Sequence, residues 1–308
     1  RSTPLYSSAA SDVYKRQVFY GDQLLGYAAA IGHQTDIGGR VAGGNACDNT
    51  EIFQEGVRLP PLKIFENDKP SEVFFKLMRT NVRVPQKVLG DINSQIAACR
   101  RGERGFLELV ERYGFENLKA QMKDLLDYSE ELTRAELSSL PDGEWEFEDF
   151  MDDDGFDPDP IRLHCKLTKK KDEILIDFRE SSKQVKGSIN MTEGFSKSAA
   201  YACIRSVMDP SIPNNDGFFR PIKFLSEPGN FLHCTFPAPV AARGVSAMRT
   251  TEVVWGALAQ MLPHKVFACG VQGDFGVTIF GYDTVSYTHL RAHETREDGG
   301  WPRLGGKK

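Results

Sequence analysis

The stretch LPDGEWEFED, residues 140–149, separates two kinds of sequence pattern in this chain. Pro141-Asp142-Gly143 is a strong turn signal. After it, Trp145 and Phe147 alternate with glutamates, the period-two pattern of a strand with one buried face. Before it, apolar residues recur every three or four positions, as they do in amphipathic helices. The change of period predicts an α+β fold, with antiparallel hairpins and a mixed sheet around a central helical region.

Working outward toward the N-terminus, the pattern predicts three helices. Ser71–Arg79 is short and amphipathic. A second helix begins at Pro85, a residue that suits the first helical position, and Gly102 either interrupts it or bends it. Gly114 suits a helix C-cap. A third helix then follows over Leu118–Leu140.

The remaining elements are read from alternation and apolar spacing on both sides of the helical region. An N-terminal hairpin, Val18–Tyr20 with Leu24–Ile31, ends in a largely apolar strand that delivers His33. Toward the C-terminus we expect a hairpin of Ile161–Lys169 and Glu173–Phe178, strands at Ile222–Leu225 and Phe275–Tyr282, and helices at Gly194–Met208 and Met248–Leu262.

Composition excludes several classes of protein. The 308 residues are 40% hydrophobic and 26% charged, with a formal net charge of -5, which suffices for a substantial core. The mildly acidic balance argues against nucleic-acid or membrane-surface binding. No run of 18 apolar residues is present, so no membrane span is expected. The chain shows no secretory signal core, and its six cysteines form no CxxC pair. We therefore expect reduced thiols in the cytoplasm.

The two ends of the chain carry a signal of a different origin. Asp12–Gln17 can be encoded as GAT GTG TAT AAG AGA CAG, and Val285–His289 as GTC TCT TAT ACA CAT. These strings are reverse complements and resemble the inverted ends of a sequencing-library transposon adaptor. We therefore predict that residues 1–17 and 285–308 are non-native tails, and that residues 18–284 are a partial domain. Other codons in the source DNA would contradict this prediction.

The densest chemistry lies in GHQTDIGG, residues 32–39, directly after the apolar strand. His33 and Asp36 are three residues apart on backbone loosened by glycine, so they can ligate a divalent cation in an exposed turn. Other residues would have to complete the ligand set. The alternative is that Asp36 caps a turn and His33 makes a single hydrogen bond.

The following stretch, TEIFQEG at residues 50–56, offers further candidates. Glu51 and Glu55 can act as a catalytic general acid/base pair or, with Asp48, as further ligands, and Arg58 can hold a substrate carboxylate. The alternative is a helical turn with capping acids, because Glu51 and Glu55 are four residues apart. Arg220 lies in the loop NNDGFFRP, residues 214–221, which is either a site for a polar substrate or a structured connector.

Other motifs are absent or weak. The chain has no GxxxxGK[ST], no GxGxxG followed by a helix and no GxSxG, so it shows no nucleotide site of its own and no nucleophile elbow. The acidic run DDDG at residues 152–155 lacks the spacing of a calcium loop and is typical of a solvated turn. His164, His233 and His264 are isolated among apolar neighbours, which favours structural histidines over metal ligands.

Several stretches together resemble one known family. They are GHQTDIGG (32–39), TEIFQEGVRLPP (50–61), NVRVPQKVLGDINSQIAACRR (81–101), LPDGEWEFEDFMDDDG (140–155), DFRESSKQVKGSIN (177–190) and IPNNDGFFRPI (212–222). In this order they are similar to the B component of the hydantoinase/oxoprolinase family, which includes N-methylhydantoinase B subunits and the C-terminal half of 5-oxoprolinase. The resemblance covers nearly all of residues 18–284 and implies that flanking family regions are missing, so we expect this chain alone to be inactive.

The resemblance implies an ATP-dependent hydrolase that opens a small cyclic amide such as a hydantoin or 5-oxoproline. A partner A component would bind ATP and phosphorylate the ring amide oxygen, and the B component would handle hydrolysis. Related acetone and acetophenone carboxylases carry a metal in the B-like component, where His33 and Asp36 would map; the ion here would be Mn, Zn or Mg. Many relatives have a second histidine beside the first, whereas Gly32 and Gln34 flank His33 here. A carboxylase component and a structural component without chemistry are the alternatives.

Overall fold

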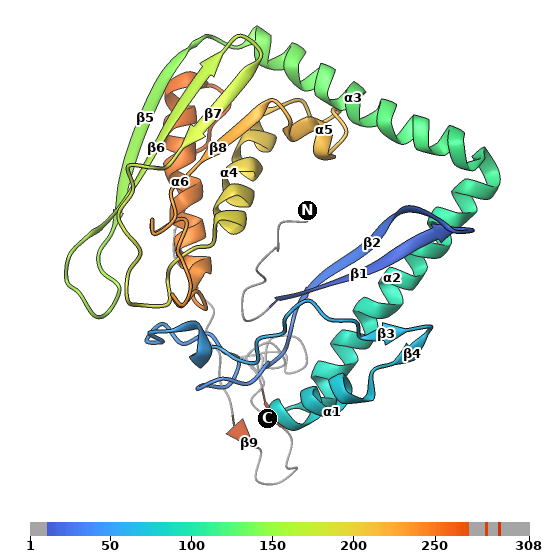
Figure 1. Ribbon diagram of the computed structural model, residues 1–308. Coiled ribbons are helices and arrows are strands. Elements are labelled where there is room, and N and C mark those ends of the chain that lie inside the picture. Colours follow the sequence, from blue (N-terminus) through green and yellow to red (C-terminus); the bar gives the residue numbers. More distant parts are fainter. Residues whose placement is uncertain (1–10, 271–280, 283–288, 291–308) are drawn as a thin grey trace, which may run out of the picture. The chain divides into compact units, whose positions relative to one another are not determined.

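The computed structural model describes residues 11–270, 281–282 and 289–290 (Figure 1). Contacts divide the chain into a unit of residues 1–272 and a smaller unit of residues 273–308. The larger unit contains helices, small antiparallel sheets and a mixed sheet, so the predicted α+β class is confirmed. In the smaller unit the described residues form the antiparallel pair β9 (Gly281–Tyr282) and β10 (His289–Leu290). The rest of the strand predicted at Phe275–Tyr282 lies outside the described residues.

The N-terminal hairpin consists of β1 (Ser11–Tyr20) and β2 (Gln23–His33), paired antiparallel as predicted. One face of β2 carries the small residues Gly26, Ala28, Ala30 and Gly32, and this face packs against the second helix. β2 therefore lies close to that helix and ends at His33. The strand β1 begins within the residues assigned to an adaptor, but pairing does not report the origin of a sequence, so that assignment stays a prediction.

Three helices form the central region as predicted: α1 (Glu72–Asn81), α2 (Pro85–Tyr113) and α3 (Phe115–Ser139). Helix α2 runs unbroken through Gly102. It ends at Gly114, whose φ of 80° and N–H bond to the carbonyl of Val110 make it the C-cap. A short hairpin of β3 (Phe65–Glu66) and β4 (Lys69–Pro70) precedes α1. Met78, Val88 and Ile92 are fully buried in the core that α1 and α2 share with β1.

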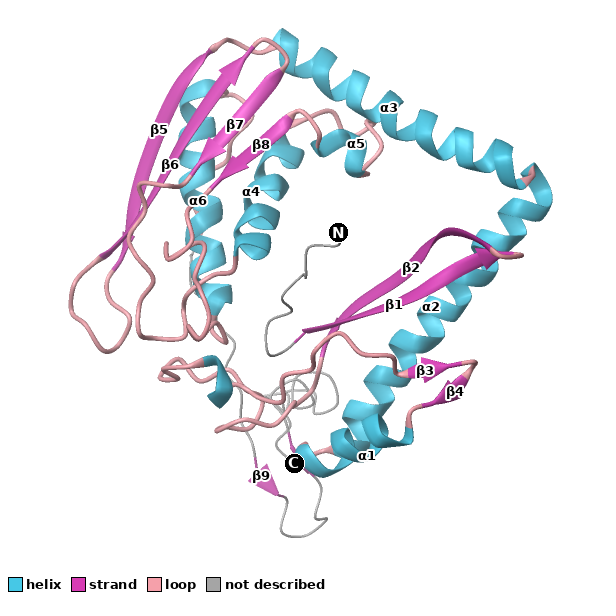
Figure 2. Cartoon of the chain, viewed as in Figure 1, coloured by secondary structure: helices cyan, strands magenta, loops and turns pink. Residues whose placement is uncertain are grey.

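The second half of the larger unit is a four-stranded mixed sheet in the order β5-β6-β7-β8 (Figure 2). Its strands are β5 (Gly143–Met151), β6 (Ile161–Lys170), β7 (Glu173–Asp177) and β8 (Ile222–Leu225), with β7 and β8 parallel. The helices that follow β7 are α4 (Glu193–Val207), α5 (Asp216–Phe219) and α6 (Arg243–Met261).

Alternation along β6 decides which face of this sheet is buried. Leu163, Cys165 and Leu167 are inaccessible to solvent and join residues of α4 and α6 in the larger core. The alternate residues lie on the opposite face, where Arg162 and Lys166 form ion pairs with glutamates of β5. Helix α6 begins at Arg243, five positions earlier than the predicted start at Met248. Among the described residues, no helix is long and apolar enough to cross a membrane.

Candidate functional site

A loop of four positive-φ glycines follows β2, and we call residues Gly38–Gly44 the glycine loop. It lies against the segment after the 3-10 helix η1 (Ile52–Gln54). At Gly39, with φ of 87°, a Cβ would stand 2.6 Å from the carbonyl oxygen of Gln54. A side chain is thus excluded by both conformation and space. The N–H of Arg40 donates to the same carbonyl at 2.7 Å, which joins the loop to η1.

Asp36 is the residue around which this loop folds. Its side chain is fully buried, and its oxygens accept from the backbone N–H groups of Gly38 (2.8 Å) and Gly43 (3.1 Å). Nη1 of Arg83, just before α2, lies 3.1 Å from Oδ1 and 3.3 Å from Oδ2. His33, by contrast, is exposed at the end of β2. The predicted pair therefore occupies two different environments.

The divalent metal that the family resemblance implies does not fit these residues as they lie. In the part of the chain that the structure describes, no group of three or more histidine, cysteine, aspartate or glutamate side chains is arranged to hold a metal ion. Asp36 is already surrounded by N–H donors.

Glu55 forms a long-range link between the segment after η1 and the segment that leads into α6. Its Oε1 accepts from the N–H groups of Val240 (2.6 Å) and Ala241 (2.8 Å), and its Oε2 is buried without a hydrogen-bond partner. Burial raises the pKa of Glu55 to about 7, although the two N–H groups and the charge of Arg243 act in the opposite direction. A carboxyl group with such a pKa exchanges a proton near neutral pH.

Glu51 and Arg58 lie on the exposed side of the same segment. The guanidinium of Arg58 stands over two aromatic rings, 5.4 Å from the centroid of Phe53 and 4.6 Å from that of Phe236. These rings meet edge to face at 5.5 Å and are themselves 56% and 62% exposed. Stacking fixes the plane of the guanidinium while its N–H edges stay available to an anion.

Arg220 lies on another part of the fold. Its Nη1 donates to Asp127 at 2.9 Å and to Glu130 at 3.0 Å, both on α3. The loop that carries it is capped by Asn215, which accepts from the N–H of Gly217. In this structure Arg220 is thus a connector between α3 and α5, and the contacts it makes are not with the glycine loop.

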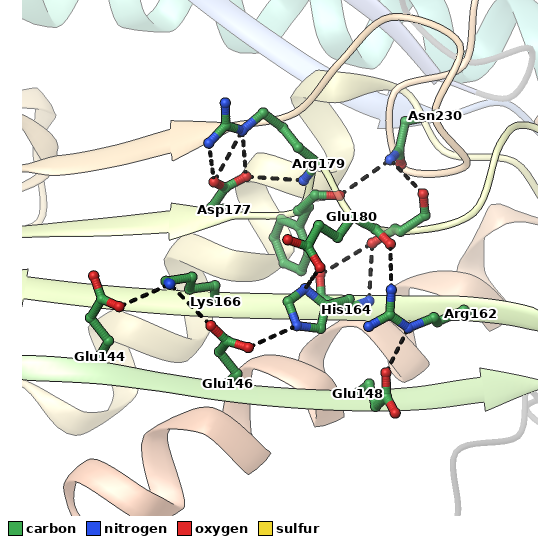
Figure 3. A network of polar contacts seen from close by, with 12 residues as sticks. Glu144, Glu146, Glu148, Arg162, His164, Lys166, Asp177, Arg179, Glu180 and Asn230 are labelled. Carbon is green, nitrogen blue, oxygen red and sulfur yellow. Dashed lines mark hydrogen bonds and ion pairs between the residues drawn. The ribbon is translucent and has the colours of Figure 1, made fainter.

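The charged face of the four-stranded sheet holds a separate polar network (Figure 3). His164 on β6 is only 5% exposed, and its Nε2 lies 3.5 Å from Glu146, its Nδ1 3.9 Å from Glu180. Lys166 reaches both Glu144 and Glu146 at about 3 Å and, with His164, lowers the pKa of Glu146. The Nδ1 atom of His164 is buried without a hydrogen-bond partner, and the structural role predicted for His164 stays a prediction.

Five of the six predicted site residues come from one stretch of the chain, residues 33–58: His33, Asp36, Glu51, Glu55 and Arg58. Two of them, Asp36 and Glu55, are fully buried, and the other three are exposed. Sequence reasoning missed Arg83 and the segment from Phe236 to Ala241. Arg83 sits inside the matched stretch NVRVP, where an arginine between two valines just before a helix was the available signal.

Comparison with known proteins decides the family. The family model described as Hydantoinase B/oxoprolinase matches residues 13–306. The chain belongs to the hydantoinase B/oxoprolinase family. Its relatives include the B subunit of a putative D-/L-hydantoinase from Pseudomonas sp. (strain NS671), 34% identical over 263 residues, which cover 82% of this chain and 44% of the relative. The caprolactamase beta subunit of Pseudomonas jessenii is 32% identical over 270 residues, covering 87% of this chain and 46% of that relative.

Solved structures agree with the family assignment. The crystal structure of the ATP-dependent caprolactamase from Pseudomonas jessenii matches with a TM-score of 0.85 at 30% identity, covering 94% of this chain and 50% of that one. A nucleotide-free acetone carboxylase matches with a TM-score of 0.84 at 16% identity, over 92% of this chain and 40% of that one, which shows a shared fold. This hydantoinase B-like chain spans about half the length of the curated relatives it matches.

Proposed function

We propose that this chain is part of the B component of an ATP-dependent cyclic-amide hydrolase. The observation that carries the proposal is the 34% identity, over 82% of the chain, to a protein named as the B subunit of a putative hydantoinase. Relatives named caprolactamase beta subunit and 5-oxoprolinase 1 (Arabidopsis thaliana) support the same class, because caprolactam and 5-oxoproline are both cyclic amides. Names that specify one subunit of an enzyme support a partner, which we propose to be an ATP-binding A component acting in the cytoplasm.

The exposed residues of the site suit the hydrolytic step. In the proposed reaction the partner activates the ring amide with ATP. Transfer of the γ-phosphoryl group to the ring amide oxygen releases ADP. Water then adds to the activated carbon, the C–N bond breaks, and the nitrogen leaves with a proton. A second water releases phosphate from the acyl phosphate that remains and frees the carboxylate. Glu51 is the proposed base that takes a proton from water, and Arg58 the proposed group that holds the carboxylate formed by ring opening. Glu55 and Arg220 are engaged in bonds within the fold, so we propose supporting roles for them.

The test is coupled ATP turnover by the full-length B component with its A component. We expect ATP consumption that depends on a hydantoin, 5-oxoproline or caprolactam, with stoichiometric ring opening. The Glu51→Gln variant should lower the rate constant about 100-fold or more, which is the usual contribution of a general base. Glu116→Gln, which removes an exposed glutamate on α3, is the matched control and should keep the wild-type rate. Full activity of the A component alone would contradict a catalytic role and favour a structural one.

A carboxylase component is the second candidate, and one relative favours it specifically. The acetophenone carboxylase delta subunit of Aromatoleum aromaticum is 28% identical over 239 residues, or 77% of this chain. The same assay separates the two reactions. ATP consumption that requires bicarbonate together with acetone or acetophenone, and none of the cyclic amides, would replace the hydrolase proposal with a carboxylase.

A further inference from the structure

We infer that Asp36 is a positioning residue that folds the glycine loop through Arg83, and that it does not ligate a metal. A carboxylate can accept only a limited number of hydrogen bonds. Two oxygens offer about four lone-pair directions. Here Oδ1 receives the N–H of Gly38 and Nη1 of Arg83, while Oδ2 receives the N–H of Gly43 and the same guanidinium nitrogen. Three donors of the protein therefore engage both oxygens of Asp36, and Nη1 of Arg83 is shared between the two oxygens.

Arg83 closes the arrangement from the other side. Its Nη2 donates to the carbonyl of Gly39 at 2.6 Å, and its Nη1 donates to that of Val41 at 3.4 Å. The carboxylate thus holds two N–H groups of the loop, and the guanidinium that neutralises it holds two carbonyls of the same loop. Together the two residues bond N–H and carbonyl groups of the loop backbone, and within the loop the N–H of Gly44 also donates to the carbonyl of Val41 at 3.2 Å.

Electrostatics argue against a cation at Asp36. The side chain of Asp36 is 0% exposed, and the guanidinium of Arg83 lies directly against it. A divalent ion entering beside Asp36 would have to displace the guanidinium or stand against its positive charge in a poorly hydrated place. The ion pair already provides the compensation that a buried carboxylate requires.

The consequence for the site follows from chain connectivity. Asp36 lies three residues after His33, so anchoring it fixes the exit of β2. The glycine loop in turn holds η1 through the bond from Arg40 to the carbonyl of Gln54. Asp36 therefore acts on His33 and Glu51 through the loop. That this positioning affects catalysis rests on the proposed function. That Asp36 and Arg83 hold the glycine loop in place does not.

Limited trypsin digestion tests the anchoring, because Arg40 is an exposed cleavage site inside the loop. In the full chain, Asp36→Asn and Arg83→Met should each raise the rate of cleavage after Arg40 about 10-fold or more, as loss of one partner of a buried pair opens the loop. Arg83→Lys keeps the charge but not the fork of donors, so it should restore protection only in part. Arg79→Met removes an exposed arginine on α1 and is the control, expected to leave this rate unchanged.

The same digestion with metal ions added or removed tests whether Asp36 binds a metal. We expect Mn²⁺, Zn²⁺ or EDTA to leave the cleavage rates after Arg40 unchanged in wild type and in both variants. Unchanged protection in both Asp36→Asn and Arg83→Met would overturn the anchoring role. A different result would make Asp36 a metal ligand. In that case Mn²⁺ or Zn²⁺ would slow cleavage after Arg40 in the wild type and in Arg83→Met, but not in Asp36→Asn. Neither readout uses turnover, so failure of the hydrolase proposal would leave this test intact.

Discussion

Replacing Glu55 with glutamine should remove a loss of stability that the wild-type protein suffers as the pH rises from about 4.5 to about 7. Burial raises the pKa of Glu55 in the folded state from 4.5 to about 7. Between these values the folded protein retains a proton that the unfolded chain has lost, so the free energy of unfolding falls as pH rises through this window. The pKa difference corresponds to about 3 kcal/mol, which is fully lost above the folded-state pKa.

Glutamine reproduces the neutral form at every pH. Its carbonyl oxygen can still accept the N–H groups of Val240 and Ala241. Urea denaturation at pH 5 should give similar stabilities for wild type and Glu55→Gln, and at pH 8 the variant should be more stable by about 3 kcal/mol. Glu51→Gln removes an exposed carboxylate four residues earlier and serves as the control. If the free energies of unfolding of wild type and Glu55→Gln differed by the same amount at pH 5 and at pH 8, the raised pKa of Glu55 would be contradicted.

The sequence predicts the elements well where the pattern is local. Period-two alternation places β5, β6 and β7, and the turn before β5 begins where Pro141-Asp142-Gly143 indicates. Gly114 ends α2 as its backbone freedom suggests. The continuity of α2 through Gly102 could not be decided locally, because glycine lowers helix propensity by about 1 kcal/mol and tertiary packing overrides a cost of that size.

The site is harder to predict because its decisive contacts join distant segments. Sequence spacing identified Asp36 and Glu55 as candidate site residues, because both lie in stretches rich in polar and ionisable side chains. It could not show that Glu55 reaches N–H groups 185 and 186 residues further along, or that Asp36 meets Arg83 47 residues away. The same limit applies to Arg220, whose partner Asp127 is 93 residues earlier. A one-dimensional pattern separates polar from apolar positions, and only the fold separates buried anchors from exposed reactive groups.

Replacing Gly217 with alanine adds a single methyl group and should lower the stability of this chain by an unusually large amount. In α5, a Cβ at Gly217 would stand 1.9 Å from the carbonyl oxygen of Leu126 on α3. That distance is far inside van der Waals contact, and its partner is helix backbone, which cannot rotate away as a side chain would. The short helix must therefore move off α3.

Moving α5 would disturb the contacts that seat it. Phe218 next to Gly217 is fully buried in the larger core, and Asn215 donates to the hydroxyl of Ser129 on α3 at 2.8 Å. We expect Gly217→Ala to lower the free energy of unfolding by about 3 kcal/mol, measured as a shift of the urea midpoint. Gly194→Ala is the matched control, because a Cβ there meets nothing within 4 Å in the first turn of α4. It should be neutral or stabilising by up to about 1 kcal/mol. Equal midpoints for the two variants would show that α5 does not depend on backbone contact with α3.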